Sequence, residues 1–337
     1  MNAINTFLRE NWQRFKLSRF GDGTALSSVL LTPGFQASSH IIAFVLTDGQ
    51  PTAKMVVKLP RIPGDHARLD IEAANLRYLF NLRKSVFPGT PEVLAYDNWH
   101  GHKMLVETMV PGSVLRPAAA RANFDFVLQT GRDWLMELHT TTKIATETLP
   151  KWRDTAFDNR FNVLATSFIL TPQEQVAIEK GAAIGQSIKL PELVFEHGDF
   201  SAPNLLLHNG QLGAVDWELA DPHGLPMGDF IFFLTFLAFA KNGAQSLKDC
   251  VSAFEQAFFS PGWAMTHLRQ FAEFAGIHPT QIAAVFAMCW MRYLSNMLSR
   301  LRGDNPNISA QTAAWLRGNR YYHFWLMAIE RMDELRG

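Results

Sequence analysis

The segment HGDFSAPNLLLHNGQLGAVDWE, residues 197–218, constrains this chain more than any other. It contains Asn209-Gly210, a pair that tolerates positive φ and suits the two-residue turn of a β-hairpin. With this turn at the tip, Asn204 faces Val215 and lies beside Asp216, although the two are twelve positions apart. The sequence therefore predicts a hairpin that brings two polar side chains together at its open end.

A third polar side chain, Asp199, lies a few loop residues before the hairpin. We expect the loop to deliver it to the same open end as Asn204 and Asp216. Carboxylate and amide oxygens of this kind suit Mg²⁺, which takes few protein ligands and completes its shell with water and phosphate oxygens. The alternative is that these side chains only cap turns around the hairpin.

The bulk composition excludes several classes of protein. The chain has 337 residues, enough for two lobes, with 47% hydrophobic and 18% charged residues and a formal net charge of +0. This balance predicts neither nucleic acid nor an anionic membrane as a partner. Cys250 and Cys289 fit no disulfide framework or metal-binding spacing. The first residues lack a secretory h-region, and the apolar run at 230–240 is too short to span a bilayer. We expect a soluble, cytoplasmic protein in which that run is a buried helix.

The first third of the chain has strand patterns interrupted by one helix. Glu72, Leu76 and Leu79 recur at helical spacing, so they share one face of a helix within residues 65–81. This order predicts a small antiparallel sheet with one helix packed on it. The expected strands cover residues 27–32, 40–50, 53–60, 92–99 and 102–110.

The chain after Pro111-Gly112 is predicted to be mostly helical, apart from the hairpin. A capping box at Thr171–Glu174, with Pro172 at the first helical position, marks one helix start. The expected helices cover residues 123–140, 227–241, 247–259, 280–301 and 310 to the end, with one more starting at 171. The fold class is therefore α+β, with a small sheet lobe at 1–108, a hinge near 107–112 and a larger helical lobe at 109–337.

The motif His197-Gly198-Asp199, then Asn204, then Asp216-Trp217-Glu218 resembles the signature of the aminoglycoside phosphotransferase and choline kinase-like family. That family has the bilobal protein-kinase-like fold. The order of strands, hinge and helices also matches it over nearly the whole chain, although individual residues outside the motif match weakly.

The resemblance implies a role for each residue of the motif. Asp199 would orient the acceptor hydroxyl and take its proton, while Asn204 and Asp216 would hold Mg²⁺ ions on the nucleotide phosphates. An ordinary aspartate, with a pKa of about 3.9, is a poor base, so Asp199 acts chiefly by alignment. His197 would brace the loop backbone, with Asp229 as its support. Glu218 could touch metal through water, contact the acceptor or cap the strand.

The nucleotide site would involve the sheet lobe. Lys58 in MVVKLP resembles the kinase lysine that binds the α- and β-phosphates, and Val56, on the same strand face, could lie under the adenine. Glu72 lies on the apolar face of its helix and needs a cation there, which Lys58 can supply. The alternative is that both charges are exposed. The hinge at 107–110, with Glu107 and Met109, could bind the adenine edge through backbone groups.

The phosphate loop departs from the kinase pattern. The segment PGFQASS has one glycine, Gly34, where kinases have a glycine-rich motif, so Ser38 and Ser39 would supply the N–H and hydroxyl donors. ATP is the expected co-substrate, and GTP stays open.

The acceptor is the least constrained part of the prediction. Residues 241–337 carry ten Lys/Arg and seven Asp/Glu, a balance of 10 − 7 = +3, which argues against a polycationic aminoglycoside. The many aromatic residues there could stack on a sugar or surround a quaternary ammonium, or could simply pack helices. We predict a Mg²⁺-dependent kinase acting on a hydroxyl of an amino alcohol or sugar-like compound. The alternatives are a nucleotide-binding pseudokinase scaffold and a metal-dependent phosphohydrolase; the oligomeric state stays open.

Overall fold

The structure is a computed structural model that describes residues 3–32, 40–259, 261–303, 305 and 307–336. It forms two compact units, each built from two stretches of chain. The sheet unit comprises Met1–Val114 and Asn204–Ala220, and the helical unit comprises Leu115–Pro203 and Asp221–Gly337. The sequence places the hairpin inside the helical lobe, whereas its contacts assign it to the sheet unit. The lobe boundaries at 1–108 and 109–337 stay a prediction.

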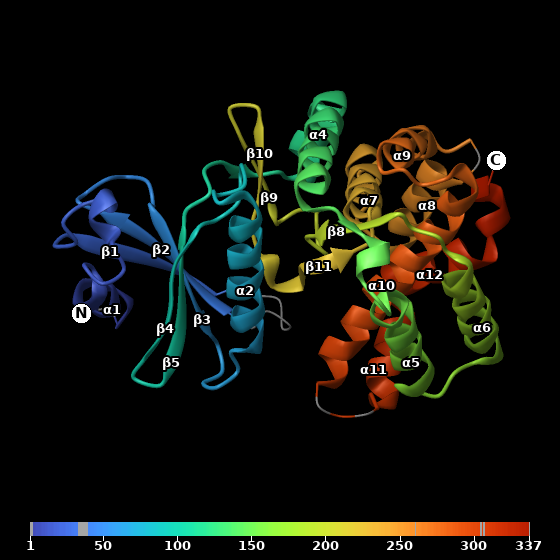
Figure 1. The fold of residues 1–337 in the computed structure, drawn as a ribbon, viewed down its shortest axis with the longest axis horizontal. Coiled ribbons are helices and arrows are strands. Elements are labelled where there is room, and N and C mark those ends of the chain that lie inside the picture. Colours follow the sequence, from blue (N-terminus) through green and yellow to red (C-terminus); the bar gives the residue numbers. More distant parts are fainter. Residues whose placement is uncertain (1–2, 33–39, 260, 304, 306, 337) are drawn as a thin grey trace. The chain divides into compact units, whose positions relative to one another are not determined.

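A five-stranded antiparallel sheet with the order β1-β2-β3-β5-β4 is the centre of the sheet unit (Figure 1). The strands cover β1 Leu26–Leu31, β2 His40–Thr47, β3 Met55–Pro60, β4 Val93–Trp99 and β5 His102–Thr108. Each expected strand is present. The sheet and the helices together confirm the α+β class.

Two helices pack on this sheet, where the sequence predicts one. The predicted helix is α2, Ala67–Arg83, and its Leu69 and Ala73 pack against Leu105 of β5. The second is α1, Ala3–Asn11, which covers the opposite face. Ile4, Phe7 and Leu8 recur at helical spacing, so the sequence carries a signal for this helix although it was not predicted.

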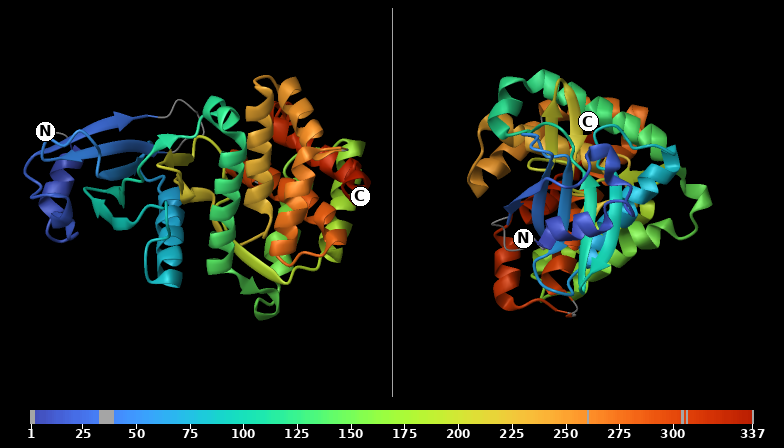
Figure 2. Two further views of the ribbon diagram at one scale, coloured as in Figure 1. Left: turned by 90° about the horizontal axis from the view of Figure 1, so that it is seen from above. Right: turned by 90° about the vertical axis from the view of Figure 1, so that its left-hand side faces the viewer.

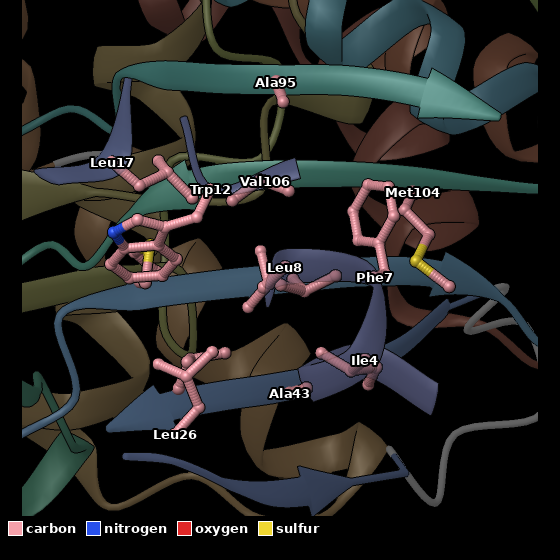
Figure 3. Close-up of a cluster of buried hydrophobic side chains, with 13 residues drawn as sticks. Ile4, Phe7, Leu8, Trp12, Leu17, Leu26, Ala43, Ala95, Met104 and Val106 are labelled. Carbon is pink, nitrogen blue, oxygen red and sulfur yellow. The ribbon is translucent and has the colours of Figure 1, made fainter. Parts of the chain in front are cut away.

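The core between α1 and the sheet is closed by large apolar side chains. Phe7 and Leu8 of α1 are fully buried, and Trp12 follows directly after the helix. Figure 3 shows these residues pointing toward Val106 and Met104 of β5. The alternation of β5 therefore buries Met104 and Val106 on one face and Leu105 on the other.

We expect Phe7→Ala to lower the free energy of unfolding by about 3 to 5 kcal/mol, because it removes a buried ring and leaves a cavity. Denaturant unfolding followed by circular dichroism measures this change. Glu10→Gln, at an exposed position of the same helix, should stay within about 0.5 kcal/mol of wild type. Equal stability of the two variants would contradict the packing of α1 on the sheet.

Helices make up most of the helical unit (Figure 2). Three short strands form a small sheet in it. Its helices are α3 Pro117–Ala122, α4 Phe124–Thr142, α5 Asn159–Thr166, α6 Pro172–Ser187, α7 Gly228–Asn242, α8 Leu247–Phe258, α9 Trp263–Phe274, α10 Ile282–Arg302, α11 Ala310–Arg317 and α12 Arg320–Glu330. Its strands are β7 Ile144–Ala145, β8 Glu192–Glu196 and β11 Asp221–Gly224, in the order β11-β8-β7. Of the helices, α3, α5 and α9 were not predicted.

The predicted features of this unit are largely present. Helix α7 is buried along almost its whole length, as expected for the apolar run. The capping box of α6 forms in both directions, with Thr171 and Glu174 each accepting the other's backbone N–H. The C-terminal helix was predicted to run unbroken, but Gly318 and Asn319 end α11, and Asn319 caps α12. Among the described residues, no single helix is long and apolar enough to cross a membrane; α7 and α8 pass that test only as a pair bent by 114°.

Candidate active site

The predicted hairpin is formed by β9, Leu205–His208, and β10, Gln211–Ala214. Asn209 and Gly210 have φ values of 47° and 80°, as the tight turn requires. At the open end, the Val215 N–H donates to the Asn204 carbonyl at 3.0 Å, which continues the predicted register. Asn204 and the residue after Val215, Asp216, therefore lie at the same end. On its other edge β9 pairs with β6, Ser113–Val114.

Asp216 has a left-handed backbone conformation, with φ 70° and ψ 67°. Such a conformation is unfavourable for a residue with a Cβ and persists only where surrounding contacts hold it. Trp217 supplies them, because it is fully buried and its indole N–H donates to the Ala214 carbonyl at 3.0 Å. The Asp216 side chain itself is 43% exposed, so its carboxylate can reach a ligand.

Lys58 and Glu72 form the predicted contact. The Lys58 Nζ lies 2.5 Å from Glu72 Oε1, and both side chains are buried. The same carboxylate oxygen accepts the Trp217 N–H at 3.0 Å. One turn further along α2, Asn75 donates to the carbonyls of Trp217 and Ala220. Helix α2 thus fixes the strand lysine and the loop carrying Asp216 in one hydrogen-bonded assembly.

The Glu107 side chain also belongs to this assembly, which its position in the sequence does not predict. It was expected to act through its backbone in the hinge, but its carboxyl group is buried and lies 3.6 Å from the Lys58 Nζ. Asp216 is also near, at 4.0 Å from the same nitrogen. The strand register pairs Glu107 with Val56, which places its side chain on the face that carries Lys58. Three carboxyl groups therefore surround one ammonium.

The protonation of this assembly follows from its burial and its charges. Burial alone would lower the pKa of Lys58, but the carboxylates of Glu107, Glu72 and Asp216 raise it above its usual value. Burial raises the pKa of Glu107 to about 8, against the attraction of Lys58, and also raises the pKa of Glu72. Lys58 is therefore charged, and Glu107 is mostly protonated at neutral pH.

We expect Glu107→Gln to stabilise the protein at pH 7. The pKa of Glu107 in the folded protein, about 8, exceeds the ordinary value of 4.5. The contribution of this carboxyl group to the free energy of unfolding is therefore complete below pH 4.5 and is lost as pH rises toward 8. Glutamine has no proton to lose, so the variant should gain roughly 2 to 3 kcal/mol at pH 7 and little at pH 4.5. Thermal unfolding at both pH values measures this, with Glu10→Gln as the control for an exposed carboxylate. A gain that does not change with pH would contradict the raised pKa.

The backbone of the expected hinge is partly engaged within the protein. The Met109 N–H donates to the Lys54 carbonyl at 3.0 Å, so this N–H is already engaged within the sheet unit. Binding of the adenine edge by backbone groups of the hinge stays a prediction. The sequence does not show this bond because it joins segments far apart in the chain. Val56 is partly buried on β3. Ser38 and Ser39 lie outside the described residues.

Glu218 contacts α2 and β2. Arg68 Nη1 donates to it at 3.4 Å, and His40 Nδ1 lies 3.6 Å away. Burial and the charge of Lys58 lower the pKa of His40 to about 4, so His40 is neutral, whereas Arg68 forms an ion pair with Glu218. These contacts hold the Glu218 side chain within the sheet unit, and its role at the site stays a prediction.

The loop carrying Asp199 belongs to the helical unit. Asp229, at the start of α7, accepts the backbone N–H groups of His197 at 2.6 Å and Gly198 at 2.9 Å. The Asp199 N–H donates to Nδ1 of the buried His197 ring at 3.3 Å. Asp229 thus supports the backbone, and His197 supports Asp199. Next in the loop, Phe200 stacks on Trp134 of α4 with ring centroids 5.0 Å apart.

The sequence of this chain matches the model of one protein family. The model of the phosphotransferase enzyme family matches residues 37–270, more than half of the chain. The chain belongs to this family. The match includes the central motif and Lys58, so the resemblance seen in the sequence is confirmed. No curated protein matches the sequence.

Solved structures of the phosphotransferases show the same protein-kinase-like fold. A thermostable mutant of the aminoglycoside phosphotransferase APH(4)-Ia, in a complex with ADP and hygromycin B, has 15% identity and a TM-score of 0.55, covering 94% of this chain and 98% of that one. The amicoumacin kinase hAmiN, in a complex with AMP-PNP, Ca²⁺ and Ami, has 13% identity and a TM-score of 0.52, covering 98% of this chain and 96% of that one. An aminoglycoside phosphotransferase from Streptomyces rimosus has 18% identity and a TM-score of 0.51, covering 89% and 99%.

Proposed function

We propose that this phosphotransferase is a Mg²⁺-dependent kinase that transfers the γ-phosphoryl group of ATP to a hydroxyl group of a small metabolite. The observation that carries the proposal is the buried Lys58–Glu72 pair, with Asp216 4.0 Å from the same ammonium. A protein has little structural reason to bury a lysine among three carboxyl groups, since each charge loses hydration. A lysine that must hold phosphate oxygens beside a metal ligand gives such a reason.

The donor set suits magnesium. Asn204 and Asp216 offer one amide and one carboxylate oxygen at the open end of the hairpin, and the Asp216 side chain is 43% exposed. No cluster of three or more His, Cys, Asp or Glu side chains in the described part of the chain could hold a metal ion. Magnesium in kinases needs no such cluster, because one or two protein ligands and the phosphates suffice. When bound, the ion would offset the charge of the phosphate oxygens.

Other residues of the chain would bind the phosphates, align the acceptor and support the loop that carries Asp199. Lys58 would bind phosphate oxygens, and Glu72 would hold its ammonium in place. Asp199 would align the acceptor hydroxyl and receive its proton late, because a loose transition state requires positioning more than a strong base. Asp229 and His197 would keep the backbone of Asp199 in position through the contacts described above.

The family's solved members suggest what to test. Two of their complexes contain ADP with hygromycin B, and AMP-PNP with Ca²⁺ and Ami. ADP release should therefore be measured with Mg·ATP and with Mg·GTP against amino alcohols, sugars, nucleosides and aminoglycosides. We expect turnover with at least one acceptor class. Nucleotide binding by calorimetry without ADP release over the whole panel would favour a non-catalytic scaffold, and phosphate release without nucleotide would favour a phosphohydrolase.

A further inference from the structure

Two tyrosines of the helical unit are near enough to Asp199 for its charge to act on them, and they are not part of the site described so far. They are Tyr293 of α10 and Tyr321 of α12, and their ring centroids are 4.4 Å apart. Burial is the largest cause that raises the pKa of each phenol. Tyr321 and then Asp199 raise the pKa of Tyr293 further, and Asp199 raises that of Tyr321 against the opposing charge of Arg320. Neither residue is fully buried. Two phenolic hydroxyls therefore lie within the electrostatic influence of the carboxylate proposed to align the acceptor.

The hydroxyl of Tyr321 has a defined direction. Arg320 Nη2 donates to its oxygen at 3.1 Å, and the Tyr293 hydroxyl forms a further hydrogen bond to the same oxygen as donor. A phenolic oxygen that accepts two hydrogen bonds keeps its own hydrogen as the remaining polar group. The Tyr321 O–H is thus a donor held on two sides, in the negative field of Asp199.

The rings are held rigidly by their neighbours. Phe232 of α7 lies 4.7 Å from the Tyr293 ring and 5.7 Å from the Tyr321 ring, centroid to centroid. Trp290 stacks on Tyr321 at 6.1 Å. Packing between α7, α10 and α12 explains why the rings are aromatic. Packing does not explain why Tyr293 and Tyr321, which are less buried than Phe232 and Trp290, carry hydroxyl groups, or why Arg320 donates a hydrogen bond to one of them.

The charges around this pair are unfavourable for a cationic ligand. The Arg320 guanidinium lies over the Tyr321 ring, 5.0 Å from its centroid. This arginine therefore already makes the cation–π contact that a quaternary ammonium would make with the ring. Arg300 is near enough to act on Tyr293 electrostatically. Two arginines beside one aspartate give this region a local charge that repels polyamines.

We propose that Tyr321, oriented by Tyr293 and Arg320, donates a hydrogen bond to an oxygen of the acceptor, and that the acceptor is a polyhydroxylated compound without net positive charge. This inference rests on the proposed kinase function and narrows its acceptor from amino alcohols and sugar-like compounds to the latter. Tyr321 is a specificity-determining residue in this proposal, because it distinguishes acceptors by an oxygen next to the reacting hydroxyl. Tyr293 and Arg320 are positioning residues that act through it.

The test compares acceptor kinetics of Tyr321→Phe, Tyr293→Phe and the wild type. The probes are neutral sugars and polyols, sugar acids, ethanolamine and choline, and a polycationic aminoglycoside, each with saturating Mg·ATP. We expect neutral or acidic sugars to be the best wild-type acceptors. Tyr321→Phe should lower kcat/KM for them about tenfold, mainly through the acceptor KM, with an unchanged KM for ATP. Tyr293→Phe should have a smaller effect in the same direction.

Tyr322→Phe is the matched control. Tyr322 is the next residue on α12, and its hydroxyl donates to Glu174 at 2.7 Å, away from this pair. The control loses a buried hydrogen bond and some stability but should keep the acceptor KM. Equal acceptor KM for Tyr321→Phe and the wild type, or preference for an aminoglycoside or choline, would overturn the inference while the kinase function stands. Absence of ADP release by the wild type with every probe would overturn both.

Discussion

Replacing Asp199 by asparagine should reduce ADP formation about a thousandfold and leave the affinity for Mg·ATP within about threefold of wild type. Asparagine keeps the size of the side chain and can still form a hydrogen bond. It cannot receive the proton of the acceptor hydroxyl, and it does not attract that proton as a carboxylate does. The substitution therefore removes alignment and proton acceptance together, which are the two functions proposed for this residue.

The structure indicates that this variant keeps the shape of its loop. The Asp199 N–H is held by His197, and the neighbouring N–H groups of His197 and Gly198 are held by Asp229. These contacts use the backbone of the loop and not the carboxylate of Asp199. Initial rates of ADP release measure the first effect, and calorimetry with Mg·ATP measures the second.

Asp158→Asn serves as the control, because it makes the same chemical change at an exposed position of the helical unit. It should keep full turnover. If Asp199→Asn also turned over at the wild-type rate, Asp199 would have no role in the reaction. A parallel loss of nucleotide binding and turnover would instead indicate that the loop had lost its conformation.

The features that were predicted from sequence depend on short-range chemistry. Asn209-Gly210 determines its turn locally, and strand alternation then determines which residues reach the open end of the hairpin. The pairing of Lys58 with Glu72 was also predictable, because strand and helix periodicity each place a charged group on an apolar face. A buried charge needs an opposite charge nearby, so the two side chains are expected to pair.

The features that were missed depend on which segments become neighbours. The alternation of β5 shows that Glu107 shares a face with Leu105, but only the register with β3 places that face against Lys58. The same applies to the Met109 N–H and its partner Lys54. The break between α11 and α12 is a local feature, unlike these long-range contacts. The dipeptide Gly318-Asn319 indicates a helix end, but the helical pattern continues on both sides of it, so one unbroken helix was predicted.

The assignment of the hairpin to the sheet unit is a consequence of the same kind of contact. The Ala214 N–H donates to the Gly89 carbonyl at 2.8 Å, and Gly89 has a φ of 73°. A Cβ on Gly89 would lie 2.3 Å from the Leu212 carbonyl oxygen, so glycine is required for this close approach. Long-range contacts of this type have no signature in the sequence around the hairpin.

The second large effect is expected for Lys58→Met. The variant removes the ammonium that Glu72, Glu107 and Asp216 share and leaves two buried carboxyl groups without it. Breaking a buried ion pair in this way lowers the free energy of unfolding by about 3 to 5 kcal/mol. Turnover should be lost as well, because no cation is left at this position to hold the phosphates.

The pH dependence separates this mechanism from a simple packing defect. Without the ammonium, the folded-state pKa values of Glu72 and Glu107 should lie above their wild-type values, which burial already raises. The unfolded state then binds fewer protons than the folded state above about pH 4.5, so stability is kept in acid and lost as pH rises. We therefore expect the difference between Lys58→Met and the wild type to be largest near pH 8 and to shrink toward pH 5. Urea unfolding across this range measures it.

Lys54→Met provides the control for the change of side chain, since Lys54 is exposed directly before β3. It should differ from wild type by less than about 0.5 kcal/mol at every pH. The double variant Lys58→Met with Glu107→Gln should recover part of the lost stability at pH 8, because one of the two unpaired carboxyl groups is gone. A stability loss in Lys58→Met that is constant with pH, and that the second substitution does not relieve, would show that the lysine stem contributes by packing and that its charge does not hold the three carboxyl groups together.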